Sequence, residues 1–200
     1  MSAAAAIRAK VDSASPGTFI RAGDFDSSRS AVDTALSRLS AARSDLVRVS
    51  RGIYWKGVDS RYGPGRPSLL DVAHAAAGNR GAGPTGWTAS HVLGLTTQVP
   101  AVPELTTVGP VPTRVKDVAL HRRSNTDRGD LTFLDIAILE VLRDDLLHVD
   151  GGWDALVDRV VELVGTGKLD LGRLARVVIT DRSPTARTNF ARLRAAVRGR

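Results

Sequence analysis

The chain has 200 residues, 42% of them hydrophobic, which is enough for one medium core or two small ones, and we expect two small domains. It carries 28 basic and 21 acidic side chains, and the formal charge of +7 favours a polyanionic partner over an acidic one. The absence of cysteine excludes a disulfide framework and thiolate chemistry, and is compatible with a cytoplasmic location.

Neither a targeting segment nor a membrane span is expected. Residues 1–10 have no sustained apolar stretch of the kind found in signal peptides. Elsewhere no apolar run approaches the roughly 18 residues that are needed to cross a bilayer. We therefore expect no membrane partner.

The first quarter of the chain begins with short elements. Residues 3–11 are rich in alanine and predict a helix, which residues 15–17 (Ser-Pro-Gly) end. Residues 18–20 predict a short strand that pairs with a later hairpin. Asp24 can cap a brief helix that begins at Phe25.

A second helix is predicted over residues 31–39. Ser28 or Ser30 can cap it, because a serine oxygen can accept a free backbone N–H at a helix start. Its apolar residues recur at helical spacing and form one face: Ala31, Val32, Ala35, Leu36 and Leu39. The polar residues lie on the other side: Arg29, Asp33, Thr34, Ser37 and Arg38.

A hairpin follows directly. Residues 46–49 predict a strand, residues 50–52 a turn, and residues 53–56 the returning strand. Residues 47–56 contain three basic side chains and no acid. A basic turn next to a polar helical face suits a DNA duplex with phosphates on its rim.

This order predicts a winged helix-turn-helix. Its expected DNA-binding residues are Arg29, Ser30, Asp33, Thr34, Ser37, Arg38, Arg48, Ser50, Arg51 and Lys56. The alternative is a small helix–hairpin module whose charged face is merely solvated, since capped amphipathic helices and hairpins are common.

The rest of the chain predicts a separate domain, and the expected fold class is α+β. Residues 1–58 would form the winged helix, and residues 59–67, rich in glycine and proline, a linker. Residues 68–200 would form a mainly helical α+β domain with an antitoxin or interaction role. Its predicted helices are 69–77, 85–93, 131–148 (the longest), 153–164, 171–179 and 185–197, with strands at 106–108 and 118–120.

Charge is unevenly distributed in this second part. Residues 124–172 hold four basic and eleven acidic side chains (−7), whereas residues 173–200 hold eight and one (+7). We expect residues 183–198 to fold back as a helix on residues 131–164 and to neutralise them. Its apolar side would be Ala186, Phe190, Leu193 and Val197, with Arg192 and Arg194 facing acids such as Asp144 or Asp158.

No pattern predicts catalysis, a cofactor or a metal. Residues 165–168 (Gly-Thr-Gly-Lys) lack the remaining positions of a phosphate-binding loop and are typical of a helix C-terminus. The four histidines are scattered without metal-ligand spacing: His74, His91, His121 and His148. No serine lies in a nucleophile elbow.

The chain resembles the AbiEi family of antitoxins and transcriptional regulators from type IV toxin–antitoxin systems. The resemblance covers four segments: AVDTALSRL (31–39), LVRVSRGIYWK (46–56), SRYGPGRPS (60–68) and PTGWTASHVLGLTTQVPAVPELTTVGP (84–110). It implies that residues 29–38 correspond to the recognition helix and residues 48–51 to the wing. It also implies that the first domain binds the promoter of its own operon and that the C-terminal domain helps to neutralise a nucleotidyltransferase-like toxin.

We therefore expect a sequence-specific DNA-binding transcriptional regulator, an autorepressing antitoxin rather than an enzyme, with double-stranded operator DNA and a toxin as partners. Three alternatives remain open: a solitary regulator without a toxin, a nucleic-acid-processing enzyme with its site in residues 84–145, and a structural protein that binds nucleic acid without sequence preference.

Overall fold

The computed structural model describes residues 3–61, 63–78, 80–109 and 117–200. Helices and short strands in both halves make the chain an α+β protein, as expected. It divides into two compact units, Met1–Ala76 and Ala77–Arg200, each with a hydrophobic core of its own. The division falls beyond the segment predicted as a linker, residues 59–67.

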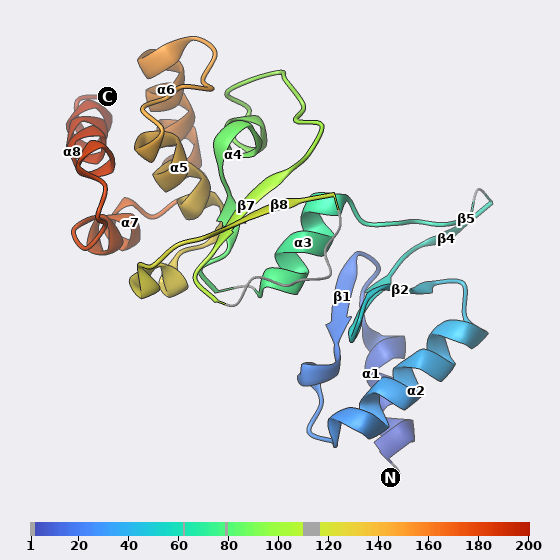
Figure 1. Cartoon of the computed structure of the whole chain (residues 1–200). Coiled ribbons are helices and arrows are strands. Elements are labelled where there is room, and N and C mark those ends of the chain that lie inside the picture. Colours follow the sequence, from blue (N-terminus) through green and yellow to red (C-terminus); the bar gives the residue numbers. More distant parts are fainter. Residues whose placement is uncertain (1–2, 62, 79, 110–116) are drawn as a thin grey trace. The chain divides into compact units, whose positions relative to one another are not determined.

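The first unit begins with two helices and a three-stranded antiparallel sheet. In chain order these are α1 (Ala3–Ser13), β1 (Thr18–Arg21), the 3-10 helix η1 (Ala22–Asp24), α2 (Arg29–Ala42), β2 (Leu46–Ser50) and β3 (Ile53–Lys56). The sheet order is β1-β3-β2, so the central strand β3 pairs with both neighbours. Figure 1 shows α1 and α2 side by side. The predicted hairpin and the strand that pairs with it are confirmed.

The apolar faces of α1, α2 and the sheet form the core of this unit. Its fully or almost fully buried residues are Ile7, Val11, Ile20, Ala22, Val32, Leu36, Leu39, Leu46 and Tyr54. Ala31 is exposed and Ala35 half-buried, so the inward face of α2 is narrower than its apolar pattern predicts. The polar side of α2 faces outward as a result.

The turn before α2 differs from the prediction. The helix expected from Phe25 is wrong, because Phe25 is extended with a φ of −125°. Asp24 is instead the last residue of η1, and its carboxylate accepts the backbone N–H of Arg21, the residue before η1, at 2.8 Å. Of the two candidate caps of α2, Ser28 is the one used, and its Oγ accepts the Ala31 N–H at 3.4 Å.

The segment predicted as a linker contains structure. Two short strands, β4 (Asp59–Ser60) and β5 (Gly63–Pro64), pair with each other, and α3 (Leu69–Ala77) follows. Arg21 Nε on β1 donates to the carbonyl of Ala75 at 3.3 Å. Most of α3 belongs to the first unit, although the helix was expected in the second domain.

The second unit combines a small sheet with a cluster of helices. Its elements are β6 (Gly83–Pro84), α4 (Gly86–Val92), β7 (Glu104–Thr107), β8 (Ala119–Arg122), η2 (Thr126–Asp130), α5 (Phe133–Arg143), α6 (Gly152–Gly165), α7 (Leu171–Val178) and α8 (Pro184–Arg198). The sheet order is β6-β7-β8, with β6 antiparallel and β8 parallel to β7. No helix among the described residues has both the length and the hydrophobicity needed to cross a bilayer.

The central helix α5 is shorter than the helix predicted over residues 131–148. A capping box formed by Thr132 and Asp135 starts it, and it ends at Arg143. Asp145 and Leu146 have φ angles of 51° and 62°, a left-handed conformation that a right-handed helix cannot contain.

The C-terminal helix α8 docks as predicted. Ala186, Phe190 and Leu193 are each at most 5% exposed and lie in one core with residues of α5 and α6. The expected partners of its arginines are wrong. The guanidinium of Arg192 lies 4.0 Å from the centre of the Trp153 ring, and Arg194 lies over Phe190.

Candidate nucleic-acid interface

The outward face of α2 carries most of the predicted DNA-binding residues. Arg29, Ser30, Thr34, Ser37 and Arg38 are exposed, and Asp33 is half-buried. They face outward because the other side of the helix is buried in the core. Neither Arg29 nor Arg38 has a hydrogen-bond or ion-pair partner within the described part of the chain, so both guanidinium groups can bind an external anion.

The β2–β3 hairpin is held against this helix by its turn. Gly52 has a φ of +72°, which glycine adopts without strain. A Cβ atom at this position would lie 3.7 Å from Asp33 Oδ1 and 3.8 Å from Ala22 Cβ. The tip of the hairpin therefore packs directly beside α2. The pairing shifts register between Arg48 and Ser50, a bulge that is known to redirect neighbouring side chains.

The helix and the hairpin border a groove of about 430 Å³. Its lining residues are Asp33, Thr34, Ser37, Arg38, Arg48, Arg51 and Tyr54. Six of the ten predicted residues thus lie on one concave surface, although they come from two separate elements. Arg29, Ser30 and Ser50 lie outside this lining.

Tyr54, which no sequence pattern marks as a binding residue, is the buried member of this groove. The pKa of its hydroxyl is raised above 10, mainly by burial and also by the nearby charge of Asp33. The charge of Arg48 and a hydrogen bond with Ser37 act in the opposite direction but do not outweigh burial. The phenol is therefore neutral at physiological pH.

The groove also contains one carboxylate, that of Asp33, among its three arginines. Asp33 Oδ1 is buried without a hydrogen-bond partner in the described structure.

Lys56, the last of the ten predicted residues, does not line this groove. It is only 7% exposed, and its Nζ lies 2.6 Å from Asp45 Oδ2. Asp45 also accepts two hydrogen bonds from Arg43, each of 2.9 Å, and these bonds together with the one from Lys56 hold the pKa of Asp45 well below its usual range. Residues 47–56 contain no acid, but Asp45 lies two residues before them in the chain. The composition of the hairpin therefore does not reveal the partner of Lys56.

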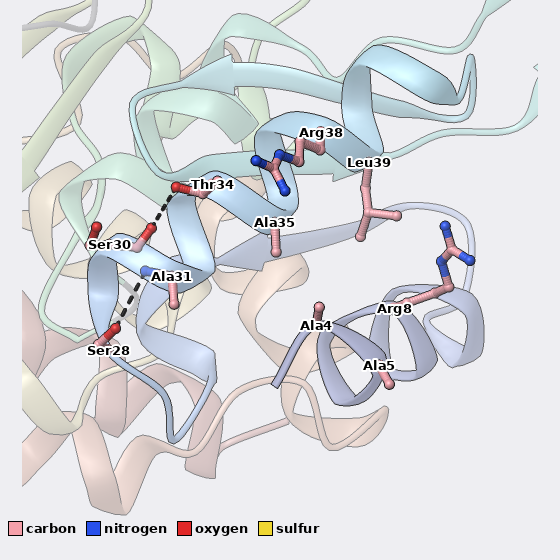
Figure 2. Close-up of a pocket in the computed structure, with 10 residues that line it drawn as sticks. All are labelled: Ala4, Ala5, Arg8, Ser28, Ser30, Ala31, Thr34, Ala35, Arg38 and Leu39. Atoms are coloured by element: carbon pink, nitrogen blue, oxygen red, sulfur yellow. Dashed lines mark hydrogen bonds between the residues drawn. The ribbon is translucent and has the colours of Figure 1, made fainter. Parts of the chain in front are cut away.

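A second groove, of about 710 Å³, lies between α1 and α2 (Figure 2). It is lined by Ala4, Ala5, Arg8, Ser28, Ser30, Ala31, Thr34, Ala35, Arg38 and Leu39. No motif marks Arg8, and only the packing of α1 on α2 places it beside predicted residues. Thr34 and Arg38 line both grooves, which therefore lie on the two sides of α2.

The second unit uses its charged residues differently. The carboxylate of Glu140 is fully buried and accepts hydrogen bonds from Thr85 (2.8 Å), Arg123 (2.6 and 3.3 Å) and Arg128. Arg143 Nε lies 3.7 Å from the same carboxylate. Burial raises the pKa of Glu140, but the charge of Arg128 and the bonds from Arg123 and Thr85 outweigh it, so the pKa lies below its usual value.

Two further ion pairs with buried carboxylates lie in this unit, and Arg143 links one of them to Glu140. Arg143 Nη2 donates to both oxygens of Asp181 at 2.7 and 2.8 Å, and Arg173 Nε donates to Asp135 at 2.6 Å. Both carboxylates are inaccessible to solvent. Within the described residues, no three histidine or acidic side chains are grouped closely enough to hold a metal ion. Each of these three buried carboxylates is therefore paired with at least one arginine, although Arg128 Nε and Nη1 and Asp135 Oδ1 are buried without a hydrogen-bond partner in the described structure.

Comparison with known proteins assigns a family but no activity. Residues 6–119 match the family of unknown function DUF6088, and because the match spans more than half of the chain, the chain belongs to this family. A search of curated proteins finds no match. Among solved structures, the crystal structure of the RV2827C protein from Mycobacterium tuberculosis is similar, with a TM-score of 0.45 and 16% identity, over 96% of this chain and 75% of that chain.

Proposed function

We propose that this chain is a sequence-specific DNA-binding transcriptional regulator whose first unit is a winged helix-turn-helix. The order of α1, β1, η1, α2, β2 and β3 and the sheet order β1-β3-β2 are typical of that fold. In this assignment η1 takes the place of the first helix of the helix-turn-helix, α2 is the recognition helix, and the β2–β3 hairpin is the wing.

The observation that carries the proposal is the groove between α2 and the hairpin. It joins the outward face of a 14-residue helix to a basic turn, and its Arg38, Arg48 and Arg51 have no hydrogen-bond or ion-pair partner in the described chain. An α-helix with its side chains is about 10–12 Å wide, which matches the roughly 12 Å of the DNA major groove. Arg38 would contact base edges, whereas Arg51 at the tip would contact phosphate.

The proposed mechanism is occlusion of a promoter. With α2 in the major groove and the hairpin on the flanking backbone, the protein covers its operator and represses its own operon. DUF6088 has no established function, so the antitoxin role and the nucleotidyltransferase-like toxin as a partner rest on the AbiEi motifs quoted above. A cytoplasmic location follows from the proposed DNA partner.

The test separates the two kinds of contact in the full-length chain. Binding to a duplex from the gene's own upstream region and to a shuffled duplex would be measured over a range of salt concentrations. Arg51→Ala should weaken both complexes equally and lower the salt slope by about one. Arg38→Ala should cost roughly 1–3 kcal/mol on the upstream duplex alone, provided that it contacts a guanine there.

Arg182→Ala is the matched control, because Arg182 is exposed, lies in the second unit and has no hydrogen-bond or ion-pair partner in the described structure. If Arg38→Ala and Arg51→Ala both bind like the wild type at every salt concentration, the α2–hairpin surface is merely solvated and the proposal fails. Equal affinity of the wild type for both duplexes would indicate a nucleic-acid-binding protein without sequence preference.

A further inference from the structure

The groove between α1 and α2 has no assigned role, yet it borders the same helix face as the proposed interface. Figure 2 shows Ser28 and Ser30 at one end of this groove, Leu39 and Arg8 toward the other, and alanines of both helices between them. Because Thr34 and Arg38 also line the hairpin groove, these two residues form a ridge with a groove on each side.

The lining of this groove suits a sugar–phosphate backbone. Phosphates in protein–DNA complexes are bound by arginine, by serine and threonine hydroxyls, and by the groups at helix N-termini. The groove contains Arg8, the hydroxyls of Ser28 and Ser30, and no acidic residue. Arg8 is exposed and has no hydrogen-bond or ion-pair partner within the described chain. Ser28 Oγ accepts the Ala31 N–H, which leaves its own proton available for a phosphate.

The dimensions of DNA connect the two grooves. A helix of about 10–12 Å nearly fills a major groove of about 12 Å, so both bounding backbones run close beside it. One backbone would meet the hairpin with Arg48 and Arg51. The other would run past α1, where the short side chains of Ala4 and Ala5 leave room for it.

We infer that the α1–α2 groove receives the second sugar–phosphate backbone of the duplex, with Arg8 as its phosphate contact. This inference rests on the proposed function. It extends the interface from the helix–hairpin surface to α1, so that the protein holds both strands that border one major-groove segment.

The experiment compares salt-dependent DNA binding of full-length Arg8→Gln, Arg51→Gln and Arg182→Gln. Arg8→Gln should weaken binding to every duplex roughly five- to tenfold at 0.1 M salt and lower the salt slope by about one, as Arg51→Gln does, while Arg182→Gln leaves the slope unchanged. Ala4→Leu, which narrows the groove without changing charge, should weaken binding several-fold. Unchanged circular dichroism and melting temperature show that each variant is folded.

Phosphate-ethylation interference on the wild-type complex gives a second readout that needs no variant. Interference should occur on both strands, at phosphates that face each other across one major-groove segment. Interference on one strand, together with wild-type binding by Arg8→Gln and a reduced slope for Arg51→Gln, overturns the inference and leaves the proposed function standing. If Arg51→Gln also keeps the wild-type slope, both fail.

Discussion

The two units use arginine in opposite ways. In the first unit, Arg38, Arg48 and Arg51 surround a groove and have no hydrogen-bond or ion-pair partners within the described residues. In the second unit, Arg128 is fully buried against Glu140, and Arg143 holds the buried Asp181. An uncompensated charge is inexpensive in water and costly in a protein interior. The first arrangement can attract a polyanion, whereas the second arrangement fixes a fold.

The net charge of a segment does not show where positive charge is available to a partner. The last 28 residues of the chain carry +7, but α8 packs against α5 and α6, and Arg192 and Arg194 of this helix lie over aromatic rings of the same unit. Arg187 donates to the Asp181 carbonyl, and Arg200 pairs with Asp158. Residues 1–76 carry eleven basic and seven acidic side chains (+4), and Arg38, Arg48 and Arg51 among them have no hydrogen-bond or ion-pair partner within the described residues.

The largest expected effect is on the buried network. Glu140→Gln leaves Arg128 and Arg123 without their counter-ion in a buried site, and should cost about 3–5 kcal/mol of unfolding free energy. Urea denaturation of the full chain measures this loss. Glu162→Gln is the control, because Glu162 forms an exposed pair with Arg159 and should change stability by less than about 1 kcal/mol. Equal effects of the two variants would contradict the distinction between buried and solvated arginine.

A comparable loss is expected at the docked C-terminal helix. Phe190 is 5% exposed, so Phe190→Ala should cost about 3–5 kcal/mol because it removes buried apolar contacts and leaves a cavity. Ile179, which is 76% exposed, provides the control Ile179→Ala. An unchanged melting temperature for Phe190→Ala, together with weaker binding to arbitrary DNA, would show that residues 183–198 act as a basic arm.

A smaller effect is expected at Asp45 in the first unit. Asp45→Asn removes the charge that binds Arg43 and Lys56, and should cost about 1–3 kcal/mol at pH 7. Because the pKa of Asp45 in the folded state lies below the unfolded value of about 3.9, its contribution is complete above that pH and is lost as the pH falls further.

The pH dependence provides the measurement for Asp45. Stability of the first unit, followed by the amide NMR signals of α2 in urea, should be level from pH 7 to 5 and fall below about pH 4. The decline should be shallower in Asp45→Asn. A parallel decline in both proteins would show that Asp45 is not the titrating group.

The smallest expected effect concerns the contact between Arg192 and Trp153. Arg192 is exposed, so Arg192→Ala should cost only about 0.5–1 kcal/mol through the lost cation–π interaction. The melting temperature in low and high salt measures it. Arg192→Gln, which removes the charge and keeps much of the side-chain length, should lose most of the same stability. A loss of several kcal/mol would mean that α8 depends on its charges more than on Phe190.

The elements with a regular local pattern were predictable from the sequence. Periodicity and a serine cap predict α2, strand-forming residues on both sides of the turn at residues 50–52 predict the hairpin, and apolar spacing predicts the inward face of α8. Six predicted residues lie together on one groove because α2 and the hairpin are adjacent in the chain, with a short connection. Binding of DNA to that groove stays a prediction.

Only the tertiary structure decided which charged groups are free. Lys56 forms an ion pair with Asp45, and the packing of α1 on α2 places Arg8 beside α2. The Glu140 carboxylate accepts hydrogen bonds from residues of three other segments, which are Thr85, Arg123 and Arg128. The sequence by itself determined where α2, the hairpin and α8 form, because hydrophobic periodicity and capping act over a few residues. Burial and ion pairing depend on side chains far apart in the chain, so no local pattern reveals which arginines are left to meet a partner.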